Sequence, residues 1–157
     1  CLHASATPRE SVMKPVHLVV FIIWGALCSS LLVYAAMLSS MTFAPGKGDA
    51  SSAGAIIALA AGSAAALSFV LRKLLLGGFS TGTLSVDDPA NRGRFIAGNV
   101  VLFALSEGVG ALGFVNGLCS NGKGGAWLPY IGLAFILMLL HIPLPSRFRP
   151  RQDGYQR

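Results

Sequence analysis

Charged residues are scarce in this chain of 157 residues: they make up 11% of it, whereas hydrophobic residues make up 54%. Soluble domains carry about a quarter charged residues, so this composition argues against a water-soluble globular protein. Its mean hydropathy of +0.66 is typical of a protein embedded in lipid. Because unsatisfied backbone cannot face hydrocarbon, the sequence predicts an all-α integral membrane protein, a four-helix bundle.

The sequence patterns of most enzymes and cofactor proteins are also missing. No Ser-His-Asp set, paired catalytic carboxylates or Cys/His cluster occurs, and the three cysteines lack metal-ligand spacing. The net charge of +6 comes from basic residues that flank apolar runs, without the interleaved aromatics of a nucleic-acid surface. We expect no enzyme, no cofactor, no small-molecule substrate and no nucleic-acid partner.

Four apolar stretches are predicted to be membrane spans. They cover about residues 16–41, 53–71, 95–118 and 127–142 and form a single transmembrane domain over 16–143. Residues 1–15 are expected to be a leader that is either not native or disordered, and residues 144–157 a basic cytoplasmic tail. The connector 77–92 is rich in turn formers and is expected to be flexible.

The basic residues predict the orientation of these spans. Ten of the twelve Lys and Arg precede the first span, lie between the second and third, or follow the fourth, whereas Lys47 and Lys123 lie in the other two connections. The positive-inside rule then places both termini and the central connector in the cytoplasm of a cell-membrane protein. An even number of spans requires the same arrangement.

Glu107 is the acidic residue that falls inside a long apolar stretch, near the middle of the third span. A carboxylate at that depth costs several kcal/mol unless it is protonated, paired or facing water, which makes it a functional-site hypothesis. Ser63 and Ser68 of the second span are possible hydrogen-bond partners, and Ser63 belongs with Glu107 to the candidate ion- or proton-binding set. We therefore expect the second span to pack against Glu107.

Small residues form stripes on the second and third spans, where they would let helix backbones approach closely. The residues expected to pack helices are Gly54, Ala58, Gly62 and Ala66 in the second span and Gly110, Gly113 and Gly117 in the third.

A small-residue helix, a basic connector and the run Ala104-Leu-Ser-Glu-Gly-Val-Gly-Ala-Leu-Gly-Phe-Val-Asn-Gly-Leu118 together give residues 54–118 a family resemblance. This part of the chain resembles the rotor-ring proteolipid (c-type) subunits of rotary ATPases. The resemblance implies that Glu107 carries a proton or sodium ion, that Ser106 is an accessory oxygen, and that Gly113 matches the family's Tyr-Gly-Leu glycine.

Two further hypotheses remain open at this stage. His17 and His141 lie near the cytoplasmic ends of the first and fourth spans, where they could ligate a haem or, more plainly, bond to headgroups and freed carbonyls. For the whole chain, the hypotheses are an ion-handling homo-oligomer and an accessory subunit among other membrane subunits, in which Glu107 makes only an interhelical hydrogen bond.

Overall fold

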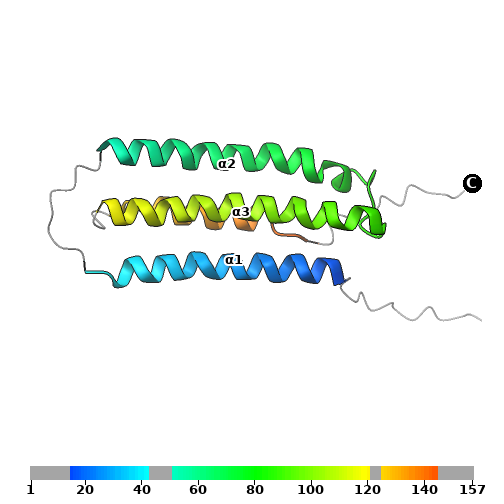
Figure 1. The fold of residues 1–157 in the computed structure, drawn as a ribbon, viewed down its shortest axis with the longest axis horizontal. Helices are drawn as coiled ribbons and strands as arrows, with labels where there is room; N and C mark the ends of the chain where they lie inside the picture. Colours follow the sequence, from blue (N-terminus) through cyan, green and yellow to red (C-terminus); the bar gives the residue numbers. More distant parts are fainter. Residues whose placement is uncertain (1–14, 43–50, 121–124, 145–157) are drawn as a thin grey trace, which may run out of the picture.

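The computed structural model describes residues 15–42, 51–120 and 125–144. These residues form four helices: α1 (Pro15–Ser40), α2 (Ser51–Ser80), α3 (Pro89–Cys119) and α4 (Leu128–Leu140). Figure 1 shows α1, α3 and α2 side by side along a common axis, with α4 behind α3. Apart from their inner ends, the predicted leader and basic tail lie outside the described residues, as do Lys47 and Lys123.

The all-α prediction is confirmed for the part of the chain that the structure describes. Helix α1, the 28 residues of α2 from Ala53 onward, and α3 are long and apolar enough to cross a membrane. Helix α4 has only 13 residues, so the predicted helical span 127–142 was too long. Its end is explained by Pro143, because the residue before a proline is displaced from the α-helical conformation.

Helix α3 is the centre of the fold, because it packs against all three other helices. Phe95, Leu102, Phe103 and Val109 of α3 are almost completely buried in the core. Helix α1 also packs against α4, whereas α2 is attached mainly along its α3-facing side. Most of the surface of α2 therefore stays open in the isolated chain.

The non-helical connection between α2 and α3 is shorter than the connector 77–92 predicted from the sequence. Helix α2 continues to Ser80 because Phe79 is buried against Phe95, and only residues 81–88 form the turn. Gly82 adopts a φ of 78°, which favours glycine. Asp88 then caps α3 by accepting a hydrogen bond of 3.0 Å from the Ala90 amide, with Pro89 in the first helical turn.

The last two residues of α4 are exposed, whereas His141 and Pro143 after the helix are buried. The last four carbonyls of a helix need hydrogen-bond donors from beyond its own residues. The Leu137 carbonyl accepts both the His141 amide, at 2.9 Å, and the His141 Nδ1–H, at 2.7 Å. The Ile142 amide donates to the Leu139 carbonyl at 3.3 Å. The chain then continues without helix through Pro143, which is fully buried.

The other two terminal carbonyls of α4 are bound by side chains from neighbouring helices. Trp24 of α1 donates its indole N–H to the Met138 carbonyl at 2.9 Å. Arg72 of α2 donates to the Leu140 carbonyl at 2.7 Å. A guanidinium at this position also complements the negative end of the helix dipole. The end of α4 is thus held by both α1 and α2.

Candidate functional site

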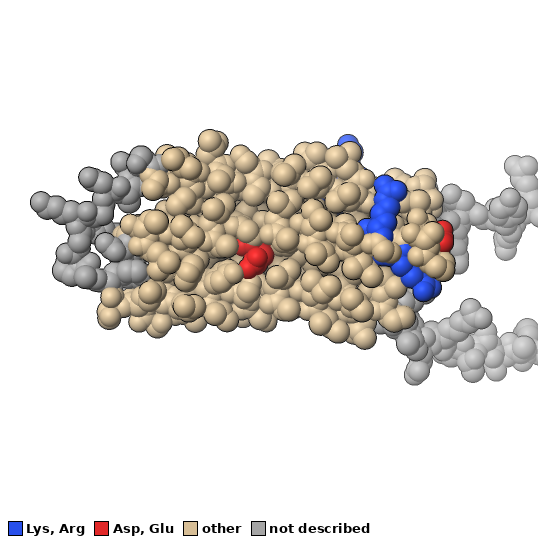
Figure 2. Space-filling view, in the orientation of Figure 1, with Lys and Arg blue, Asp and Glu red and all other residues tan. Residues whose placement is uncertain are grey.

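Glu107 lies midway along α3, on the side that faces α1. Its side chain is half-buried, so the carboxyl reaches the protein surface. Figure 2 shows an acidic group at the surface halfway along the bundle, far from the basic residues gathered at the end with the α2–α3 turn. The other described acids, Asp87 and Asp88, belong to that turn.

The hydrogen bonds of the Glu107 carboxyl come from α1. Tyr34 donates its hydroxyl hydrogen to Oε1 over 2.6 Å, and the Ser30 hydroxyl lies 3.2 Å from the same oxygen. Ser30 also bonds to the Leu27 carbonyl at 2.7 Å, and it has one hydrogen to share between the two acceptors. Tyr34 is therefore the principal donor to Glu107.

The expectation that the second span supplies the partner of Glu107 was wrong. Ser63 is exposed on α2, and no hydrogen bond joins it to Glu107 in the described structure. Ser68 is buried but bonds to the Ala65 carbonyl of its own helix at 2.7 Å. The reason is geometric: Glu107 lies on the side of α3 next to α1, where the hydroxyls of Tyr34 and Ser30 are both within hydrogen-bond distance of Oε1.

Ser106 is adjacent to Glu107 in sequence but lies on a different side of α3. Its side chain is fully buried, and its hydroxyl donates to the Leu102 carbonyl one turn earlier at 2.8 Å. In this arrangement the hydrogen bond of the Ser106 hydroxyl is made within α3. Its accessory-oxygen role stays a prediction from the sequence.

The two predicted small-residue stripes lie in different surroundings. Gly110 and Gly117 of α3 face Leu31 and Leu38 of α1, and Gly113 faces α4. On α2, Gly54 is half-buried, whereas Ala58, Gly62 and Ala66 point away from the bundle. Helix α2 contacts α3 instead through Ala61, Ala65 and Leu76, a strip of different register. The regular four-residue stripe of α2 is thus free to contact something else.

The two histidines of the haem hypothesis are both buried, against different helices. The His17 ring packs edge-on against Phe95 of α3, with centroids 5.4 Å apart. The His141 ring lies 5.7 Å from Phe69 of α2. No group of three or more metal-ligating side chains is found among residues 15–42, 51–120 and 125–144. The bis-histidine haem remains a prediction from the sequence.

Sequence reasoning missed Tyr34, Ser30, Trp24 and Arg72 as residues that connect helices. A signal was available for the first pair: Ser30 and Tyr34 are polar, lie within an apolar span, and are four residues apart, so they share a helix face. The sequence indicated Arg72 only as a charge that flanks a span. Its acceptor, the Leu140 carbonyl, lies outside the hydrogen-bond ladder of the helix only because α4 ends there.

We expect Tyr34→Phe to weaken the α1–α3 contact by about 1–2 kcal/mol, because it removes the short bond to Glu107 and little else. The free energy of unfolding can be measured by titration with sodium dodecyl sulfate in mixed micelles. Ser30→Ala is the matched control, with a smaller loss because its bond is longer and shared. In a Glu107→Leu background, Tyr34→Phe should leave the free energy of unfolding almost unchanged. A loss as large as that in the wild-type background would show that Tyr34 acts through other contacts.

No known protein family, curated protein or solved structure matches this chain.

Proposed function

We propose that this chain is an integral membrane protein of the cell membrane in which Glu107 exchanges a proton or an ion, as a c-like subunit of an oligomeric complex. The observation that carries the proposal is the position of the carboxyl: it lies halfway along three helices long enough to cross a bilayer, and it is open to the outside of the bundle. Such carboxyls mark ion and proton pathways in membrane proteins.

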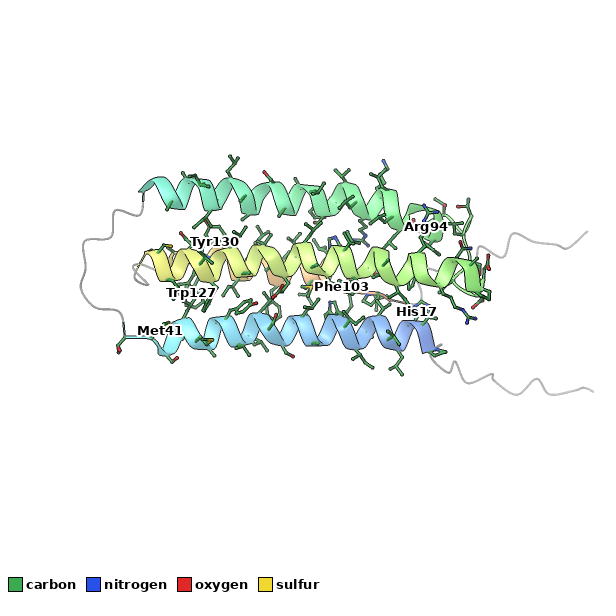
Figure 3. All side chains as sticks on the ribbon, in the orientation of Figure 1. His17, Met41, Arg94, Phe103, Trp127 and Tyr130 are labelled. Carbon is green, nitrogen blue, oxygen red and sulfur yellow. The ribbon has the colours of Figure 1, made fainter. Side chains whose placement is uncertain are left out.

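The topology in this proposal has both termini in the cytoplasm. The described basic residues gather at the end of the bundle that carries the α2–α3 turn, which supports the cytoplasmic placement of that end (Figure 2). Figure 3 shows Trp127 and Tyr130 at the opposite end, where aromatic side chains would anchor the outer interface.

The short α4 is compatible with a fourth crossing. Its 13 helical residues rise about 20 Å, and the four non-helical residues that follow, 141–144, continue the chain through turns. A hydrocarbon core is about 30 Å thick, so the fourth crossing in this proposal extends beyond α4 into residues 141–144. Non-helical backbone at membrane depth must be covered by protein, and the burial of His141 and Pro143 supports this reading.

The Glu107 site supports exchange because one of its oxygens is held while the other is open. Oε1 accepts the bond from Tyr34, and among residues 15–42, 51–120 and 125–144 no hydrogen bond to Oε2 is found. Tyr34 can stabilise either the carboxylate or the carboxylic acid whose proton sits on Oε2.

The test is labelling of the purified protein with a hydrophobic carbodiimide, which reacts with a protonated carboxyl in lipid. We expect Glu107 to be labelled at low pH and protected as the pH rises, and Glu107→Gln to abolish both labelling and proton uptake by reconstituted vesicles. Asp88→Asn, in the turn, is the matched control and should leave labelling unchanged. Absence of pH-dependent labelling at Glu107 would refute exchange.

The second proposal is that the chain is an accessory subunit in which Glu107 only bonds α1 to α3. The short Tyr34–Glu107 distance of 2.6 Å favours it, because a strong hydrogen bond between two helices is enough to explain a carboxyl at this position. Here Glu107→Gln, which can still accept the Tyr34 hydrogen, should be nearly silent, whereas Glu107→Leu should disrupt assembly. The native mass in mild detergent would separate a ring, a mixed complex and a monomer.

A further inference from the structure

Helix α3 exposes a strip of its surface near the α2–α3 turn, formed by Arg94, Ala97, Val101 and Ala104. These positions are three or four residues apart, so they lie on one face of the helix. Helix α4 lies behind α3, and α1 and α2 flank it (Figure 1). All four side chains of the strip are exposed, so no other described helix covers it.

The strip has a positive charge at one end and is apolar along the rest. Figure 3 shows Arg94 at the end of the bundle that carries the α2–α3 turn. No hydrogen bond or ion pair joins its guanidinium to another residue within 15–42, 51–120 and 125–144. Val101 is 40% exposed between two alanines, whose small side chains let another molecule approach the helix closely.

The length of α3 determines the depth of the strip in a bilayer. Its 31 residues rise about 46 Å, which is about 16 Å more than a hydrocarbon core of about 30 Å. A centred helix therefore extends about 8 Å beyond the core at each end, and Arg94 lies about 8 Å from the start of α3 at Pro89. This places Arg94 at the boundary between headgroups and hydrocarbon, with Ala97, Val101 and Ala104 within the hydrocarbon.

We infer that the strip binds a phospholipid with an anionic headgroup, whose phosphate contacts Arg94 and one of whose acyl chains lies along Ala97, Val101 and Ala104. The inference goes beyond the proposed function but rests on its membrane placement. A guanidinium binds a phosphate through two parallel N–H···O bonds. A zwitterionic lipid carries its own ammonium group, which competes with Arg94, whereas an anionic lipid leaves its phosphate to the protein. Charge complementarity therefore selects the anionic lipid.

The other described basic residues at this end of the bundle lie off the strip (Figure 2). Arg92 is two residues from Arg94, which is about 200° around the helix, and it donates to the Asp87 carbonyl at 3.3 Å. Arg72 donates to the Leu140 carbonyl, and Lys73 is exposed on α2. These residues add to the positive potential of this end, but the contact with the phosphate belongs to Arg94.

The test uses the full-length protein in vesicles with equal amounts of phosphatidylglycerol, which is anionic, and phosphatidylcholine, which is zwitterionic. The protein is extracted in mild detergent, and native mass spectrometry counts the lipids that it retains. We expect about fivefold more phosphatidylglycerol than phosphatidylcholine, and Arg94→Gln to bring this ratio close to one. Lys73→Gln is the matched control: it removes the same charge at the same end and should keep the preference.

A second pair of variants tests the seat of the acyl chain. Ala97→Phe should lower the amount of retained lipid, because the ring occupies the place of the chain. Ala60→Phe, at an exposed position of α2, should leave it unchanged. Circular dichroism checks that each variant keeps its helices, which is expected because both positions are exposed.

Equal retention of the two lipids, a preference that survives Arg94→Gln, or an equal loss in Lys73→Gln would overturn the inference. A change of native oligomeric mass in Ala97→Phe, with retained lipid unchanged, would also overturn it, because a protein would then occupy the strip. The proposed function fails separately: pH-dependent carbodiimide labelling of Glu107 without a lipid preference refutes the lipid site alone, and the reverse pattern refutes the exchange alone.

Discussion

Replacing Gly113 with leucine is expected to destabilise the protein by about 3 kcal/mol, at the upper end of the range for overpacked cores. A Cβ atom at this position would collide with the Cβ atom of Tyr130 and lie 3.3 Å from the backbone carbonyl oxygen of Trp127. Neither atom belongs to the flexible end of a side chain, so the whole N-terminal part of α4 would have to move away from α3.

The measurement for Gly113→Leu is the free energy of unfolding in mixed micelles, and Gly62→Leu is the matched control. Gly62 has no atom within 4 Å of an added Cβ, so its replacement should not destabilise the protein, and helix propensity should stabilise it by up to about 1 kcal/mol. Both variants gain the same helix propensity, so the difference between them reports packing alone. Equal stabilities would mean that α4 does not pack on α3 as described.

Replacing Arg72 with methionine is expected to cost about 2 kcal/mol, because the Leu140 carbonyl loses a charged donor while the apolar stem of the side chain is kept. Lys73→Met is the matched control: it removes the same charge from the next position, where the side chain is exposed. Unfolding by sodium dodecyl sulfate again gives the free energies. An equal loss of unfolding free energy in both variants would mean that the positive charge matters, and not the hydrogen bond of Arg72 to the end of α4.

The helices themselves were largely predictable, since long apolar stretches between turn formers allow few alternatives. The boundaries of α3 could have been predicted better, because Asp88-Pro89 combines a good N-cap residue with a proline in the first turn. The flexible connector was predicted from composition alone. Composition does not reveal that Phe79 packs against Phe95, a contact that extends α2 toward the turn.

The candidate site was only half predictable. Glu107 stands out in the sequence because an acid in an apolar stretch is costly, whatever surrounds it. Its partner depends on which helix covers that side of α3, and this is a property of the packing. Small residues on α2 indicated that helix as the partner, yet the stripe of Ala58, Gly62 and Ala66 faces outward while Tyr34 of α1 reaches the carboxyl.

The capped end of α4 also constrains the order in which the protein is assembled during synthesis. A helix of 13 residues has too little length to leave the insertion machinery for lipid by itself. Its last carbonyls are satisfied by Trp24 and Arg72, which belong to segments that the ribosome has already produced. In the proposed membrane topology, the first three helices therefore act as a template that the fourth joins.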